Sequence, residues 1–190
     1  MRVIGGTARG RRLRAPDVPG LRPTSDRVRE AIFDILASRG ALESASVLDA
    51  FAGSGALGIE ALSRGAESVC FVEEDRLCVA AIRANLESAG FASAPNVRVV
   101  RAETLDFLAG EPSPSYDLAL LDPPYSFAEW PALLGLLKAE VAVLESSVPP
   151  QVPDHLSVRR EYRYGGTLIT RVEALGSGRD DPRTTEKGPV

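Results

Sequence analysis

The sequence predicts an α/β protein with a mostly parallel seven-stranded sheet whose last strand is antiparallel. Short apolar runs alternate with amphipathic stretches over residues 26–146, the pattern of repeated strand–helix units. The first apolar run leads directly into a glycine-rich turn, as in nucleotide-binding α/β folds. Beyond residue 155, two alternating polar and apolar segments flank Gly165 and Gly166, which indicates an antiparallel pair.

The length and composition limit the class of protein. A chain of 190 residues with 44% apolar and 25% charged residues suits a single globular domain with a buried core. No apolar run approaches the roughly 18 residues of a membrane helix, and no apolar segment of a secretory signal follows the N-terminus, so we expect a cytoplasmic protein. Cys70, Cys78 and His155 are too few for a zinc cluster or a disulfide framework, and we expect no metal.

The elements follow in order along the chain. The first predicted helix covers residues 26–40, because its apolar residues recur on one face and Gly40 can end it. The same reasoning predicts further helices at 56–65, 76–90, 104–110 and 130–139, and strands at 46–51, 68–74, 96–103, 116–121, 141–146, 156–164 and 167–175.

Two further segments lack the pattern of a helix or strand. Three prolines exclude a helix from residues 147–155. The tail at 176–190 has almost no apolar residues, and we expect it to be disordered.

Positive charge is concentrated at the N-terminus. Residues 1–30 hold eight arginines against three acidic residues, a net charge of +5, whereas the remainder of the chain has a net charge of −9. The glycine-containing stretch 2–13 is typical of a short β-hairpin. A basic arm on an acidic body favours a polyanionic partner, of which nucleic acid is the commonest.

A glycine motif predicts a cofactor site. Gly53, Gly55 and Gly58 form G-x-G-x-x-G between a predicted strand and a predicted helix, and Glu73 ends the next strand. Such a loop lets the backbone approach a ligand, and the acid can accept hydrogen bonds from both ribose hydroxyls. These residues alone fit either a dinucleotide or S-adenosylmethionine. A carboxylate at Asp49 would repel a pyrophosphate but suits a sulfonium cation, which favours S-adenosylmethionine.

A second motif predicts the chemistry. The stretch Asp122-Pro123-Pro124-Tyr125 follows an apolar strand, so it lies where parallel sheets bind ligands. Proline fixes the backbone, and the Asp122 carboxylate with one backbone carbonyl can accept both hydrogens of a planar amino group. Tyr125 offers a flat face on which a nucleobase can stack. The combination is typical of methyl transfer to an exocyclic amino group.

These motifs together resemble a known family. The stretch LDAFAGSGALGIEALSRGA with LLDPPY is similar to class I S-adenosylmethionine-dependent methyltransferases that act on amino groups. With RVIGGTARGRRL and LRPTSDRVREAIFDIL, residues 2–173 closely resemble the bacterial RsmD family, which methylates N2 of a guanine in 16S ribosomal RNA. The resemblance implies a class I, Rossmann-like fold. It also implies a basic RNA-binding arm at 1–20 and a methyltransferase domain at 21–175, before the tail at 176–190.

The resemblance also implies roles for individual residues. It implies that Asp122, the carbonyl of Pro123 and Tyr125 hold the guanine. The implied S-adenosylmethionine site comprises Asp49, Phe51, Gly53, Gly55, Glu73 and Glu103, and the implied contacts to RNA come from Arg9, Arg11, Arg12, Arg14, Arg22 and Arg27. The implied partner is 16S ribosomal RNA, either alone or within an assembled small-subunit particle.

Three other functions are compatible with parts of this pattern. A DNA adenine-N6 methyltransferase, or another amino-group methyltransferase, would share the Asp122 motif, but 190 residues leave little room for a DNA-recognition domain. A dinucleotide-dependent oxidoreductase would explain the glycine loop and leave the Asp122 motif unused. A non-catalytic RNA-binding module would explain the basic arm and leave the glycine loop unused.

Overall fold

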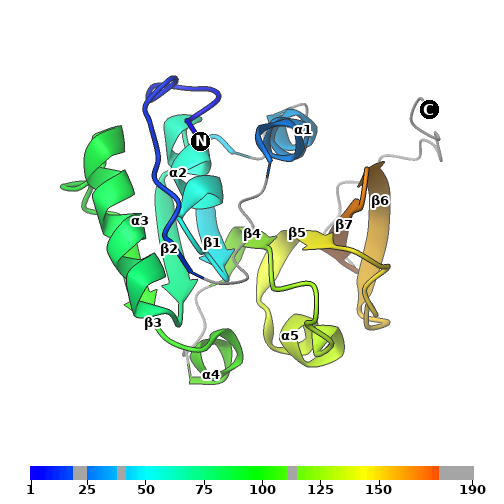
Figure 1. Ribbon diagram of the computed structural model, residues 1–190. Helices are drawn as coiled ribbons and strands as arrows, with labels where there is room; N and C mark the ends of the chain where they lie inside the picture. Colours follow the sequence, from blue (N-terminus) through cyan, green and yellow to red (C-terminus); the bar gives the residue numbers. More distant parts are fainter. Residues whose placement is uncertain (19–24, 38–41, 111–114, 176–190) are drawn as a thin grey trace.

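The computed structural model describes residues 1–18, 25–37, 42–110 and 115–175 (Figure 1). Arg22 and the tail at 176–190 therefore lie outside the described residues. In chain order the elements are α1 (Asp26–Ala37), β1 (Ser46–Ala50), α2 (Ala56–Ser63), β2 (Ser68–Glu73), α3 (Arg76–Ala89), β3 (Val97–Arg101), α4 (Thr104–Gly110), β4 (Tyr116–Leu121), α5 (Trp130–Leu136), β5 (Ala139–Ser146), β6 (Leu156–Tyr164) and β7 (Thr167–Ala174).

The seven strands form one sheet in the order β3-β2-β1-β4-β5-β7-β6. The first five strands of this order run parallel, and β7 lies antiparallel between β5 and β6. The predicted class I, Rossmann-like fold is therefore confirmed. Because the chain moves from β1 outward to β2 and β3 and returns to β4 on the other side of β1, the strand order reverses between β1 and β4. The carboxyl ends of two strands at such a reversal are where sheets of this kind bind ligands.

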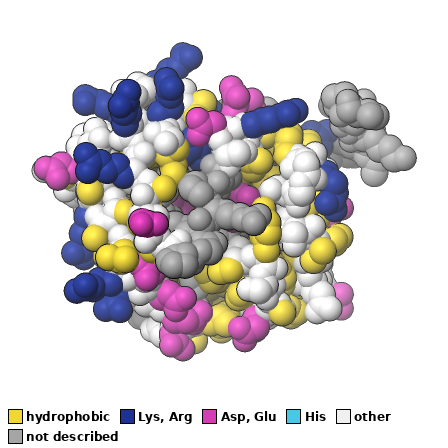
Figure 2. All heavy atoms as spheres, in the orientation of Figure 1, with side chains coloured by type: hydrophobic (Ala, Val, Ile, Leu, Met, Phe, Trp, Pro, Cys, Tyr) yellow, Lys and Arg dark blue, Asp and Glu magenta, His cyan; other side chains and the backbone are white. Residues whose placement is uncertain are grey.

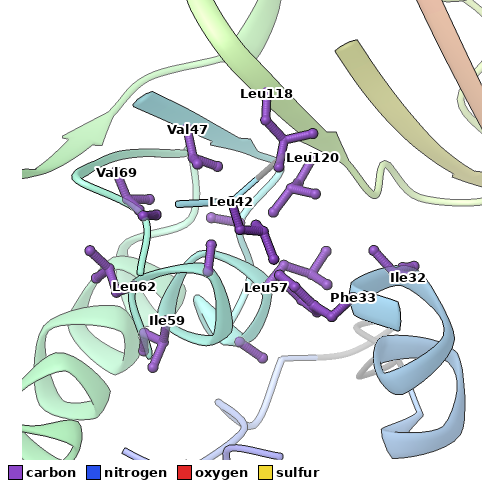
Figure 3. Packing of buried hydrophobic residues seen from close by; sticks show 14 of the residues in the cluster. Ile32, Phe33, Leu42, Val47, Leu57, Ile59, Leu62, Val69, Leu118 and Leu120 are labelled. Carbon is purple, nitrogen blue, oxygen red and sulfur yellow. The ribbon is translucent and has the colours of Figure 1, made fainter. Parts of the chain in front are cut away.

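The sheet separates two apolar layers, of which Figure 3 shows part of the first. Side chains alternate across a strand, so Val47 of β1 and Leu118 of β4 pack towards α1 and α2, with Ile32, Phe33 and Ile59 (Figure 3). The neighbouring residues of the same strands pack on the opposite face, with the core side chains of α4 and α5. That second layer includes Leu48, Ala50, Cys70, Val72, Phe107, Ala119, Leu121, Trp130, Leu133 and Leu134.

The N-terminal arm belongs to the first of these layers. Val3, Ala8 and Leu13 are each at most 4% exposed and join the core formed by α1, α2 and α3. The predicted hairpin is present, closed by one antiparallel bridge between Arg2 and Arg12. It is shorter than two full strands, because its inner backbone groups bond to the helices on which it lies.

Buried polar side chains of α2 form those bonds. The Glu60 carboxylate is 0% exposed and accepts hydrogen bonds from the amides of Ile4 and Gly5, at 2.8 and 2.7 Å. Ser63 accepts from the amides of Ala8, through its hydroxyl at 2.9 Å, and of Thr7, through its carbonyl at 2.7 Å. The backbone of the arm is thereby held against α2.

The boundary between α5 and β5 differs from the sequence prediction. The helix ends at Leu136 rather than at residue 139, and the strand begins at Ala139 rather than at 141. Leu137 takes an extended conformation, and the carbonyl of Lys138 accepts a hydrogen bond from the amide of Tyr116 at 2.8 Å. Pairing with β4 therefore starts earlier than the apolar pattern indicates.

Two glycines of the arm provide a test of its close packing. Gly6 and Gly10 both have a positive φ, 73° and 84°, but a Cβ on Gly6 would overlap the Ser63 carbonyl, whereas one on Gly10 would meet nothing within 4 Å. Gly10→Ala should cost about 1–2 kcal/mol of unfolding free energy through backbone strain alone. Gly6→Ala should cost clearly more, because the arm must also move away from α2. Urea unfolding measures the free energy of unfolding of both variants. Equal decreases in the two variants would contradict this close packing of the arm on α2.

Candidate functional site: the carboxyl edge of the sheet

The loop between β1 and α2 has the backbone of a ligand cradle. Phe51, Gly53 and Gly55 all have positive φ angles, of 59°, 54° and 75°, which turn the chain sharply into the helix. Gly58 lies one turn further, where a Cβ would collide with the ring of Phe71 and approach the Asp49 carboxylate. The glycines of the motif are therefore required by the turn and by the close packing of α2 on β2.

Acidic side chains from three neighbouring strands surround this loop. Asp49 lies near the end of β1, Glu73 ends β2 and Asp122 follows β4 directly. Asp49 is 1% exposed and accepts a hydrogen bond from the Gly58 amide at 2.8 Å. Burial raises the pKa of Asp49 well above its ordinary value, and the nearby charges of Asp122 and Glu73 raise it further against that hydrogen bond.

Glu73 at the end of β2 holds the loop between β1 and α2 through a hydrogen bond. Its Oε2 accepts a hydrogen bond from the Gly53 amide at 2.8 Å, and its Oε1 accepts one from the Asp75 amide at 2.8 Å. The cofactor loop and the end of β2 are therefore joined through one carboxylate. A further bond from Glu73 to a ribose hydroxyl would use the remaining lone pairs of the same oxygens.

These residues fit a cationic cofactor. A buried carboxyl group beside two further acids is a site where added positive charge relieves repulsion and burial cost. A sulfonium with an amino group brings such charge, whereas a pyrophosphate would add to the repulsion. Gly53 and Gly55 are buried in this turn, and Phe51 supplies a half-buried ring at the same edge.

Glu103, which the family resemblance places at the cofactor site, makes a hydrogen bond that stabilises the fold. It precedes α4, and its Oε2 accepts a hydrogen bond from the Asp106 amide at 2.8 Å, which caps the helix. The side chain is half-buried. Its contact with a cofactor stays a prediction.

The Asp122 motif forms a tight turn beside the glycine loop. Pro123 is buried, and the Pro124 carbonyl accepts a hydrogen bond from the Phe127 amide at 2.8 Å. Tyr125 is 49% exposed, and its hydroxyl lies 3.0 Å from the Thr167 hydroxyl at the start of β7. The tyrosine ring is therefore held by a hydrogen bond while much of its surface faces solvent.

Aromatic rings connect this turn to the cofactor loop. The ring of Phe127 packs edge-to-face on Phe51 and on Trp130, with both centroid separations 5.3 Å. Trp130, whose role the sequence leaves open, is 6% exposed and belongs to the core.

A pocket opens on the outer side of the Asp122 turn. Its lining residues come from two segments of the chain, Pro124, Tyr125, Phe127 and Trp130 on one side and Glu145, Ser146, Ser147 and Val148 on the other. Motif reasoning found Pro124 and Tyr125 of the first segment and left Phe127 unnamed. It missed Thr167 and residues 145–148, because β5 has the pattern of a plain apolar strand; the prolines after Val148 were the only sequence signal.

Five of the six predicted RNA-binding arginines lie within the described residues, and all five are exposed. Arg9, Arg11, Arg12 and Arg14 of the arm are exposed, as is Arg27 of α1, whereas Arg22 lies outside the described residues. Figure 2 shows Lys and Arg side chains gathered over the arm and α3, and acidic side chains along the lower edge of the same face. Because backbone groups anchor the arm, the arginine side chains are left available for an anion.

Two further observations concern other kinds of site. Within residues 1–18, 25–37, 42–110 and 115–175, no three His, Cys, Asp or Glu side chains are grouped as a metal site would require. In the same part of the chain, each helix is too short or too polar to span a bilayer. Cys70 and Cys78 are buried free thiols, and burial, with the charges of Glu73 and Asp75, raises the pKa of Cys78 to about 12.

The burial of Asp49 predicts a pH-dependent stability. A carboxyl whose pKa is raised by folding destabilises the folded state as pH rises from its unfolded pKa to its folded pKa. Asp49→Asn keeps an acceptor for the Gly58 amide and removes this penalty. We expect it to raise the urea midpoint of unfolding at pH 8, with a gain that shrinks towards pH 4.5. Asp34→Asn, at an exposed position of α1, is the control; a gain independent of pH would show that ionisation of Asp49 is not the cause.

The comparisons with known proteins agree with this geometry. The model of the family Conserved hypothetical protein 95 matches residues 1–172. A curated relative, "Ribosomal RNA small subunit methyltransferase D" of Escherichia coli (strain K12), is 39% identical over 191 residues, which cover 95% of this chain and 93% of the relative. The solved structure of yhhF from Escherichia coli superposes with a TM-score of 0.78 and 37% identity over 92% of this chain and 97% of that chain.

A more distant likeness concerns the fold alone. The crystal structure of SMU.776, which is complexed with SAH, superposes with a TM-score of 0.63 and 14% identity over 82% of this chain and 50% of that one. The match of the family model over most of the chain, with a relative of similar length, confirms the resemblance found in the motifs. The chain belongs to the RsmD family, which that model describes as Conserved hypothetical protein 95.

Proposed function

We propose that the protein transfers a methyl group from S-adenosylmethionine to the exocyclic N2 of a guanine in 16S ribosomal RNA. The observation that carries the proposal is the position of the Asp122 turn, which follows β4 directly beside the loop that follows β1. An acceptor for an amino group and a cradle for a cationic methyl donor thereby share one crevice. The curated name of the Escherichia coli relative supports the substrate class, and SAH in SMU.776 supports the cofactor.

The cofactor residues would act as follows. Gly53 and Gly55 let the backbone approach the ligand, with Phe51 beside them. The buried carboxylate of Asp49 would face the methionine part of the cofactor. Glu73 would accept hydrogen bonds from the ribose hydroxyls. Glu103, beyond β3, would lie near the adenine. Bound S-adenosylmethionine supplies an electrophilic methyl group, so positioning accounts for much of the remaining rate enhancement.

The acceptor residues would prepare the amino group. The N2 lone pair of guanine is delocalised into the ring, which makes it a weak nucleophile. Hydrogen bonds from its two N–H groups to the Asp122 carboxylate and the Pro123 carbonyl would favour a more nucleophilic nitrogen. Formation of the N–CH₃ bond, with cleavage of the bond between that methyl group and the sulfur of S-adenosylmethionine, obliges N2 to lose one proton, which the Asp122 carboxylate would accept.

The target base would be held by the aromatic face of Tyr125. A base inside an RNA helix cannot reach this turn, so the guanine must leave its stack. Tyr125, fixed by its bond to Thr167, would stack on one face of the base. We expect the base to approach the turn at the exposed face of Tyr125.

The basic arm would bind the RNA backbone. Arg9, Arg11, Arg12 and Arg14 are exposed on a hairpin that is anchored by buried bonds, and Arg27 lies on the neighbouring helix. Arginines on a rigid support contact phosphates without reading sequence. We therefore favour an assembled small-subunit particle in the cytoplasm as the natural substrate, because its shape can select one guanine.

The first test concerns the chemistry. With methyl-labelled S-adenosylmethionine and small-subunit particles that lack the modification, the wild type should label one guanine, identified by mass mapping of the RNA. Asp122→Ala should lower the rate by about 10²–10⁴-fold, as expected for a positioned proton acceptor. Its affinity for S-adenosylhomocysteine, measured by calorimetry, should change little. Label on another base, or unchanged turnover in the variant, would contradict the proposal.

The second test concerns the arm. The double substitution Arg11→Glu and Arg12→Glu should weaken binding of 16S ribosomal RNA. It should also make the dependence of binding on salt less steep, because fewer counterions are released. The matched control reverses Arg160 and Arg163, two exposed arginines of β6 at the opposite edge of the sheet. Filter binding across a salt series measures both slopes. Equal effects of the two double variants would remove the arm from RNA binding.

A further inference from the structure

One buried amide joins the arm to the cofactor loop. Asn85 lies on α3 and is 1% exposed. Its Oδ1 accepts a hydrogen bond from the Arg14 amide at 2.8 Å, and its Nδ2 donates to the Arg14 carbonyl and to the Ser54 carbonyl, each at 2.9 Å. Both hydrogens of the amide and one lone pair of its oxygen are therefore used between two segments that are forty residues apart in the chain.

The two segments that Asn85 joins carry different binding roles. Ser54 stands between Gly53 and Gly55, so its peptide planes set the direction of the loop amides. Arg14 ends the series of exposed arm arginines that we assign to RNA. In Figure 1 the arm descends across α2 and α3 towards the carboxyl ends of β1 and β2, where the glycine loop lies.

A second connection runs through the first residues of the chain. The Ser54 hydroxyl lies 3.7 Å from the Met1 sulfur, and Arg29 of α1 donates to that sulfur at 3.3 Å and to the Arg2 carbonyl at 2.7 Å. The Arg29 side chain is 0% exposed. The glycine loop is thus bonded to the arm near both ends of the hairpin.

Buried hydrogen bonds of this kind make it costly for one partner to move without the other. A movement of Ser54 away from Asn85 leaves a buried donor and a buried carbonyl without partners, at a cost of about 1–3 kcal/mol each. A ligand that orders the loop therefore also restrains Arg14, and a ligand that orders the arm restrains Ser54. Such shared ordering produces positive coupling without a large change of structure.

We propose that Asn85 is a positioning residue through which cofactor binding and RNA binding strengthen each other. The proposal rests on the function proposed above, since it requires both ligands. The coupling is reciprocal, so the factor by which cofactor tightens RNA must equal the factor by which RNA tightens cofactor. We expect about fivefold or more, the lower end of ordinary coupling between sites.

The experiment measures that factor in full-length protein. Binding of 16S ribosomal RNA is titrated with and without saturating S-adenosylhomocysteine, and the ratio of the two dissociation constants is compared among variants. Asn85→Ala should lower the ratio clearly, although the contact between Ser54 and Met1 remains. Asn85→Asp keeps the acceptor for the Arg14 amide but loses both donated bonds, and it should lower the ratio as well. Thermal melting tests whether each variant is folded. If Asn85→Ala does not fold, the ratio of dissociation constants is taken from Asn85→Asp.

A matched control separates coupling from loss of arm anchoring. Ser88, one turn further along α3, donates to the Arg12 carbonyl at 2.9 Å and is exposed. Ser88→Ala should weaken RNA binding and keep the wild-type ratio, because Ser88 contacts the arm without contacting the loop. A wild-type ratio of one, or an unchanged ratio in both Asn85 variants, would overturn the proposal. Failure of the proposed function is distinct: the wild type would then fail to bind one of the two ligands when it is titrated alone.

Discussion

Asp49 is buried at the carboxyl edge of β1, where the charges of Asp122 after β4 and Glu73 of β2 act on it, and the fold offsets part of the cost of its charge. Asp49 and Glu73 accept hydrogen bonds from the amides of Gly58 and Gly53. These amides belong to the turn and first residues of α2, where the helix carries partial positive charge. The acids therefore hold the glycine loop in place while the loop reduces the cost of their charge. A cation in the crevice completes this balance, which is the physical reason to expect a sulfonium there.

The same helix uses the same kind of bond on its other side. Glu60 is fully buried and accepts from two arm amides, with the Arg64 guanidinium at 2.7 Å as a counter-charge. Helix α2 thus lies between two carboxylate–amide contacts, one from its Gly58 amide to Asp49 of β1 and one from its Glu60 carboxylate to the arm. A short basic hairpin that would be unstable in isolation gains a fixed position from this contact. Its arginines can therefore face solvent without also having to support the fold.

The sequence predicts the features of the molecule that depend on the periodicity of apolar residues and on where strands end. The order of elements, the glycine turn and the positions of Asp49 and Asp122 all follow from apolar alternation and from the rule that ligands bind beyond parallel strands. Glu60 and Asn85 could not be found in this way. Polar residues of a helix are expected to face solvent, and the bonds that these two make to the arm and the loop go to backbone amides and carbonyls, which leave no trace in the residue types. The bond from Tyr125 to Thr167 spans 42 residues and is equally invisible.

The placement of the arm explains how so small a chain can combine two binding tasks. A separate RNA-binding domain would need its own core and a linker, and its orientation towards the catalytic crevice would vary. In this fold Val3, Ala8 and Leu13 enter the core of α1, α2 and α3, so the arginines that we propose to contact RNA and the proposed cofactor loop are packed on one core. The distance between an arginine-bound phosphate and the Asp122 turn is then set by the fold itself. Selection of one nucleotide can therefore depend on the shape of the RNA substrate, with few contacts to bases.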